Sequence, residues 1–150
     1  MTDPEYFYAL YDTLVHRVHH TRRGFDSLSE PEKVYYVLTL LRNEINNGGF
    51  DQYFFNSSGS HYSRAEAELA KLRATQTLAL LHEAKEIIFL GISVPADIKL
   101  RRKHMLSLDT CKPALARRLE AINQRFYALP DEVTPRLEAF AQEHGLVEKD

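Results

Sequence analysis

Apolar residues recur along this chain with the spacing of an α-helix rather than that of a β-strand. After an expected N-cap at Asp3, with Pro4 in the first turn, residues 7–18 place apolar side chains three and four positions apart. This spacing predicts an amphipathic helix that stops near Gly24. No stretch between turn signals sustains the period-2 alternation of a strand. The pattern therefore predicts an all-α fold.

The second apolar stripe begins with a clear N-terminal signal. Ser29 and Glu32 have capping-box spacing, and Pro31 suits a first helical turn. Glycine favours the left-handed conformation that ends many helices, so we expect this helix to end at Gly48 and Gly49. One or two further helical turns should follow in residues 50–55, and then a polar loop.

The remaining stripes bring the expected total to about six or seven helices. A proline connector and a basic stretch at residues 99–103 separate two of them, and Thr75 could mark a break within the longest. The expected segments are residues 63–89, a helix capped by Asp109 or Thr110 that Pro130 ends, and residues 134–143.

Length and composition favour a single compact domain over residues 1–150. The chain is 44% hydrophobic and 27% charged, as is usual for a globular domain. No apolar run approaches the roughly 20 residues of a membrane span, and no apolar leader follows Met1, which favours a cytoplasmic protein. The one cysteine, Cys111, excludes an internal disulfide and a zinc site built on several cysteines. We expect no cofactor.

Basic residues are concentrated late in a chain whose formal net charge is −2. A solvated helix face is one interpretation, and a patch for nucleic acid, for an acidic partner or for a second subunit is the other. No helix-turn-helix, zinc module or RNA-binding aromatic motif accompanies them, so direct nucleic-acid binding is not expected. The residues concerned are Lys99, Arg101, Arg102, Lys103, Lys112, Arg117, Arg118 and Arg125.

The most unusual segment is residues 43–59. Glycines allow a sharp turn, aromatic side chains can anchor it in the core, and amides and hydroxyls can satisfy freed backbone groups, so a structural role explains the segment completely. The alternative is a polar pocket for a small ligand, since binding residues often lie on loops that a rigid scaffold positions. The motif residues are Glu44, Asn47, Gly48, Gly49, Phe50, Gln52, Tyr53 and Asn56.

The run Asn47-Gly48-Gly49-Phe50, with Gln52-Tyr53-Phe54 and Asn56-Ser57-Ser58-Gly59, resembles the signature of a family of small bacterial all-helical proteins that includes a DNA mimic. The resemblance extends over residues 30–145. It implies an all-α domain with no established catalytic activity, a homodimer, and a protein partner. Arg73 departs from the family pattern, where glycine is expected, and could straighten or reposition a helix junction.

In the DNA-mimic member, an acidic surface stands in for DNA phosphates on a transcription regulator. Carboxylates on a helical scaffold can compete for the basic side chains that bind DNA. With a net charge of −2, only one face of this chain could be acidic, and scattered solubilising carboxylates are the alternative. The candidate face consists of Asp12, Asp26, Glu30, Glu32 and Asp51; a C-terminal set of Asp131, Glu132, Glu138 and Glu143 is the other choice.

A metal site is a weak candidate on the first helix. Asp12, His16 and His20 follow one another at intervals of four residues and share a helix face, so two imidazoles and a carboxylate could converge on zinc or another divalent metal. Histidines near the C-terminal end of a helix also interact favourably with the helix dipole, which explains them without any ligand. No His-Glu-x-x-His motif is present. We therefore assign no metal.

Catalytic constellations are equally weak. Cys111 would need a base, and nothing in the sequence orients His104 toward it. Glu44 and Asp51 flank the glycines and could form an acid–base pair, although Glu44 more simply belongs to a helix. The sequence favours a non-enzymatic protein that binds another macromolecule, with a DNA-binding regulator as the expected partner. A small-ligand protein or a hydrolase-type enzyme with its pocket at residues 47–56 is the alternative.

Overall fold

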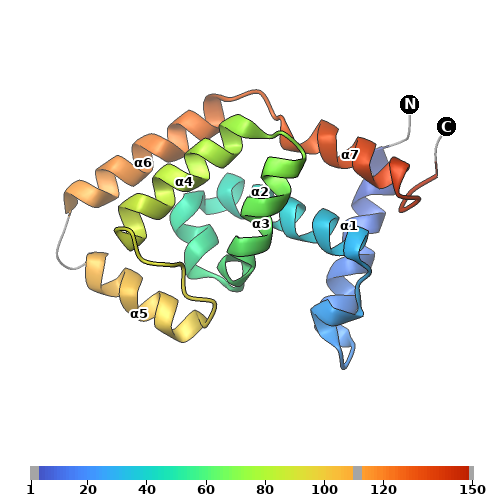
Figure 1. The fold of residues 1–150 in the computed structure, drawn as a ribbon, viewed down its shortest axis with the longest axis horizontal. Coiled ribbons are helices and arrows are strands. Elements are labelled where there is room, and N and C mark those ends of the chain that lie inside the picture. Colours follow the sequence, from blue (N-terminus) through green and yellow to red (C-terminus); the bar gives the residue numbers. More distant parts are fainter. Residues whose placement is uncertain (1–3, 110–112, 149–150) are drawn as a thin grey trace.

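A computed structural model describes residues 4–109 and 113–148 of the chain (Figure 1). These residues form seven α-helices and two short 3₁₀ helices, and none of them forms a strand, which confirms the predicted all-α class. Within this part of the chain, no helix is both long enough and apolar enough to cross a membrane. The elements are α1 (Pro4–His20), η1 (Gly24–Ser27), α2 (Glu30–Phe55), η2 (Ser57–His61), α3 (Tyr62–Lys71), α4 (Thr75–Phe89), α5 (Ile98–Asp109), α6 (Pro113–Ala128) and α7 (Val133–Glu143).

Helix α2 is the central element of the fold. It contacts α1, α3, α5, α6 and α7, so its apolar residues are covered on several sides, and Leu38, Leu41 and Ile45 have no exposed surface. In Figure 1, α1 lies at one end of the molecule and α4, α5 and α6 lie toward the other. The predicted capping box is confirmed, because the Ser29 hydroxyl accepts from the Glu32 N–H and the Glu32 carboxylate accepts from the Ser29 N–H.

The expected interruption at the two glycines is confirmed, because neither Gly48 nor Gly49 has helical backbone angles, although the helical segments on either side count as one bent element. Helix α2 continues to Phe55 across a kink, where Gly48 has φ −153° and Gly49 has φ 84°. The residues beyond the kink are helical, as predicted, but they extend the same element. Glu44 joins the two halves, because its Oε2 accepts from Gln52 Nε2 at 2.6 Å and from Asn56 Nδ2 at 3.3 Å. The glycine pair therefore ends one straight helical segment, and the second segment follows across the kink.

Other boundaries differ from the prediction by small amounts. Helix α1 ends at His20, before Gly24, and the expected break at Thr75 is confirmed because α4 begins there. Asp109 is the last residue of α5, and Thr110, the other expected cap, lies outside the described residues. Arg73 has φ 60°, so the junction before α4 keeps a left-handed turn although an arginine occupies it.

Arg101 fits neither interpretation of the basic residues, a solvated helix face or a binding patch, because it is fully buried. Its Nε donates to Phe54 O at 2.5 Å and its Nη2 donates to Asn56 O at 2.7 Å, at the C-terminal end of α2, where the helix dipole favours a cation. Burial lowers the pKa of Arg101.

Gly59 leaves room for the guanidinium group of Arg101, since a Cβ at position 59 would lie 2.7 Å from Arg101 Nε. Further acceptors for its Nη1 are Pro95 O at 2.9 Å, Ser60 Oγ at 3.1 Å and Ala96 O at 3.2 Å.

Replacing Arg101 with methionine should destabilise the fold strongly. Several carbonyls would lose their donor, and each buried unpaired group costs about 1–3 kcal/mol, so we expect the free energy of unfolding to fall by about 3 kcal/mol or more. Urea unfolding measures the change. Lys99→Met is the control on the same helix, at an exposed position where a change within about 0.5 kcal/mol is expected. Equal effects of the two substitutions would contradict the assigned role.

Candidate functional site

A cavity of about 500 Å³ opens between the C-terminal half of α2 and helices α4, α5 and α6. These helices lie together at the end of the molecule away from α1 (Figure 1). The predicted motif borders the cavity, because Gln52 and Asn56 are among its lining residues. Its apolar lining includes Ile87, Ile88, Met105, Leu108, Leu115 and Leu119, and its polar lining includes Asp51, Gln52, Asn56, Glu120 and Asn123.

Asn123 of α6 connects the kink in α2 to this polar lining. Its Oδ1 accepts from the Phe50 N–H at 2.9 Å, which requires its amino group to point the other way. There, Nδ2 donates to Glu120 Oε2 at 3.2 Å and to Asp51 Oδ1 at 3.4 Å. Asn123 is buried, with only 3% of its surface exposed. One amide thus brings two carboxylates from different helices together, and we call Asp51 and Glu120 the acidic edge.

Gly49 leaves room for the side chains of Asn123 and Asp51. Its φ of 84° lies in the left-handed region, and a Cβ there would lie 2.4 Å from Asn123 Nδ2 and 2.7 Å from Asp51 Oδ1. A side chain would therefore be strained by the backbone and would also displace the amide. Glycine at position 49 therefore leaves the space that the Asn123 side chain occupies.

No lysine or arginine among the described residues neutralises the acidic edge. Among the described residues that line the cavity, only Asp51 and Glu120 are charged, and both are acidic. Neither forms an ion pair with a described lysine or arginine. Hydrogen bonds from Gln124 and Asn123 lower the pKa of Glu120, which keeps its carboxylate ionised at neutral pH.

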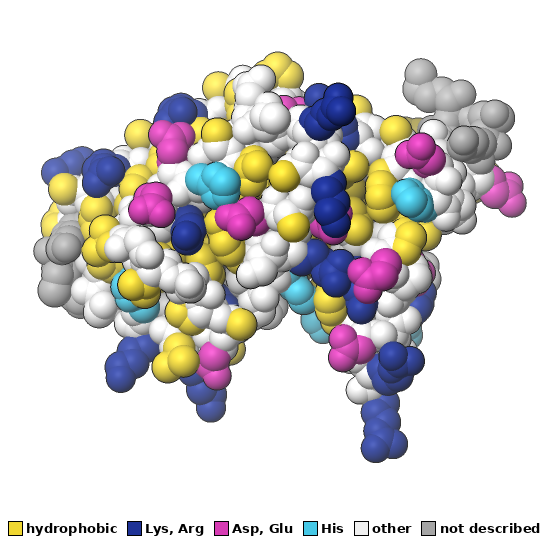
Figure 2. Space-filling view, viewed as in Figure 1, with side chains coloured by type: hydrophobic (Ala, Val, Ile, Leu, Met, Phe, Trp, Pro, Cys, Tyr) yellow, Lys and Arg dark blue, Asp and Glu magenta, His cyan; other side chains and the backbone are white. Residues whose placement is uncertain are grey.

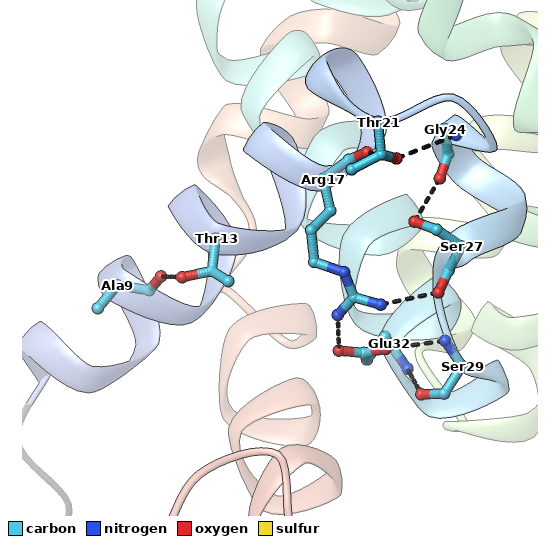
Figure 3. A network of polar contacts seen from close by, with 8 residues as sticks. All are labelled: Ala9, Thr13, Arg17, Thr21, Gly24, Ser27, Ser29 and Glu32. Atoms are coloured by element: carbon cyan, nitrogen blue, oxygen red, sulfur yellow. Dashed lines mark hydrogen bonds and ion pairs between the residues drawn. The ribbon is translucent and has the colours of Figure 1, made fainter.

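Two of the other predicted acidic-face residues are used within the fold. Figure 3 shows Arg17 of α1 extended toward Glu32, with Arg17 Nη1 donating to Glu32 Oε2 at 2.5 Å. Burial raises the pKa of Glu32, but the hydrogen bonds from Ser29 and Arg17 outweigh this effect and lower it. Glu30 pairs with Arg64 at 3.0 Å and with Lys33 at 3.4 Å, and the hydrogen bond and charge of Arg64 lower its pKa.

The five residues of the predicted face are not all neighbours. Glu30 and Asp51 lie near opposite ends of α2, so the structure places Asp51 on the acidic edge and not beside Glu30. Asp12 and Asp26 are exposed on α1 and η1. Of the alternative C-terminal set, Asp131 accepts from the backbone N–H groups of Val133 and Thr134, and Glu132 accepts from Thr77 N–H; Glu138 is half-buried and Glu143 is exposed.

The remaining basic residues are dispersed. Figure 2 shows basic and acidic side chains mixed over the visible face instead of sorted into separate regions. Arg117 and Arg118 are exposed as predicted, and Arg125 is exposed but pairs with Glu83 at 3.0 Å. Arg102 is half-buried, and its guanidinium lies 4.6 Å from the centre of the Phe55 ring. Lys99 and Lys103 are exposed on α5, and Lys112 lies outside the described residues.

The weak metal and catalytic candidates take ordinary structural contacts. The rings of His16 and His20 stack with centres 4.5 Å apart, and no three His, Cys, Asp or Glu side chains of the described residues are arranged to hold a metal ion. His104 Nε2 bonds to Ile88 O at 2.6 Å. Cys111 lies outside the described residues. Glu44 and Asp51 engage different partners, Gln52 and Asn123 respectively.

One comparison with known proteins gives a match. A protein-family model described as DMP19-like protein matches residues 26–144, which is most of the chain and close to the span of the resemblance seen in the sequence. No curated protein and no solved structure matches the chain.

The double requirement for glycine at position 49 can be measured by substitution. Gly49→Ala should lower the free energy of unfolding by about 2–4 kcal/mol, because φ 84° with ψ 179° is a conformation essentially restricted to glycine that costs about 1–3 kcal/mol, and the contact with Asn123 adds to that cost. Gly91→Ala is the matched control, with φ 86° and no atom within 4 Å of its Cβ, and should cost only about 1–2 kcal/mol. Chemical denaturation compares them, and equal losses would refute the contact with Asn123.

Proposed function

Because the chain belongs to the DMP19-like protein family, we propose that it binds a DNA-binding protein as a mimic of DNA, with the acidic edge in the place of phosphates. The observation that carries this proposal is the convergence of Asp51 and Glu120 on Asn123 without a described lysine or arginine beside them. Proteins that bind DNA present lysine and arginine to phosphate oxygens. Two adjacent carboxylates offer these side chains a similar set of acceptors.

The proposed contact is local and does not involve the whole surface. The formal net charge is only −2, and the acidic and basic side chains are mixed over the face that Figure 2 shows. Glu30 and Glu32 have arginine partners in the chain and are less available to a second protein. Because charges are screened beyond about 8 Å at physiological salt, a partner would sense the acidic edge only at close range.

The kink gives the acidic edge a fixed geometry before any partner arrives. Asp51 follows the kink by two residues, and Asn123 holds both its carboxylate and that of Glu120 from a buried position. A preorganised pair loses less side-chain entropy on binding than two free carboxylates. The proposal assigns the chain no catalytic step, metal or cofactor.

Removing the negative charges of Asp51 and Glu120 should weaken binding of the partner protein. We expect the tagged wild-type chain to capture a DNA-binding protein from native cell extract, and duplex DNA to displace it. Asp51→Asn with Glu120→Gln keeps an oxygen acceptor for Asn123 at each position but removes both charges, and should reduce capture at least tenfold. Mass spectrometry identifies and quantifies the captured protein.

Asp12→Asn with Asp26→Asn is the matched control, because it removes two exposed carboxylates from α1 and η1 and leaves the acidic edge intact. This variant should capture the partner as the wild-type chain does. If only the control variant failed to capture the partner, the contact would lie at the α1–η1 end of the molecule and not at the acidic edge. A partner that duplex DNA does not displace would contradict mimicry of DNA.

A further inference from the structure

The cavity behind the acidic edge is larger than a contact between two carboxylates and a basic side chain requires. Its volume of about 500 Å³ falls within the range of pockets that hold small organic ligands. Such pockets have mostly apolar walls and a few polar groups that set the orientation of the ligand. We propose that this cavity binds a small amphipathic cation, with its apolar chain between α4, α5 and α6 and its ammonium group at Asp51 and Glu120.

The apolar part of the proposed ligand fits the walls of the cavity. Ile87 and Ile88 contribute from α4, Met105 from α5 and Leu119 from α6, and all four are buried residues of the hydrophobic core. At the mouth, Leu106 lines the cavity and is 54% exposed. An alkyl chain would cover this apolar surface and remove it from water, which favours binding.

The sign of the ligand charge follows from the lining. The charged lining residues of the described chain are Asp51 and Glu120, and both carry negative charge when ionised. Asn123 donates to both carboxylates and so holds them on one side of the cavity. An ammonium group is favoured there, and a carboxylate with the same alkyl chain is repelled.

The remaining polar lining includes two amides whose amino groups are already engaged within the chain. The side-chain amides of Gln52 and Asn56 both donate to Glu44, which ties them to the first half of α2. Their arrangement is part of the kink and exists without a ligand. These two amides are therefore positioned before a ligand binds, and Asp51 and Glu120, which pair with no described lysine or arginine, lie beside the apolar wall.

This inference shares the acidic edge with the proposed function but does not rest on it. A small ligand needs the volume of the cavity, whereas a basic protein surface needs only the charge at its edge. A substitution that fills the cavity and keeps the carboxylates separates the two. Ala116 of α6 is exposed and lines the cavity, so Ala116→Trp places an indole at its mouth. Ala114 is exposed on the same helix and is not a lining residue, so Ala114→Trp is the matched control.

Two probes of equal chain length and opposite charge test the proposal: n-octylammonium and n-octanoate, titrated below the concentrations at which they aggregate. Isothermal titration calorimetry should show saturable binding of octylammonium and at least tenfold weaker binding of octanoate. Ala116→Trp should abolish octylammonium binding while Ala114→Trp retains it. Asp51→Asn with Glu120→Gln should remove the preference for the ammonium group.

No saturable octylammonium binding by the wild-type chain would overturn the inference, as would equal binding of the two probes or unchanged binding by Ala116→Trp. Circular dichroism melting verifies that each variant is folded. Failure here, with capture of a DNA-displaced protein intact, would overturn the cavity ligand alone. Conversely, octylammonium binding without any such capture would overturn the proposed function and leave the ligand site standing.

Discussion

The hydrogen bond from the Phe50 N–H to the side chain of Asn123 is the interaction on which the candidate site depends. A break in helical geometry at Gly48 and Gly49 redirects the backbone there, and a buried N–H without an acceptor would be costly. Asn123 satisfies it with its oxygen, so its amino group must face Asp51 and Glu120. One backbone irregularity thus sets the position of α6 against α2 and the geometry of the acidic edge.

Local sequence signals predicted the helices well, because capping residues, prolines and apolar spacing act within a few turns. The same signals failed where a distant group decides the outcome. Gly48 and Gly49 do interrupt the helix, but their spacing does not reveal the hydrogen bond between Glu44 and Gln52 that joins the two segments across the kink. Arg101 lies in a basic run typical of a solvated face. It is nevertheless buried, and carbonyl groups at the end of α2 accept its hydrogen bonds. Spacing along the chain carries no information about such acceptors.

The candidate site was only half predictable for the same reason. The motif pointed to residues 47–56 and to Asp51, whereas Glu120 and Asn123 lie more than sixty residues further along the chain. The available signal was a polar Asn123 directly after the buried Ile122 on an amphipathic helix. Carboxylates that look alike in the sequence differ in the fold, because Glu30 and Glu32 are paired with cations, whereas no described lysine or arginine pairs with the acidic edge.

Amide hydrogen exchange at Phe50 measures whether the side chain of Asn123 holds the kink in place. In the wild-type chain, the Phe50 N–H should be as well protected as the amides of buried α2 residues such as Leu41. In Asn123→Ala, its exchange should accelerate at least tenfold while that of Leu41 changes far less. Equal acceleration of both amides, or no change at Phe50, would contradict the account.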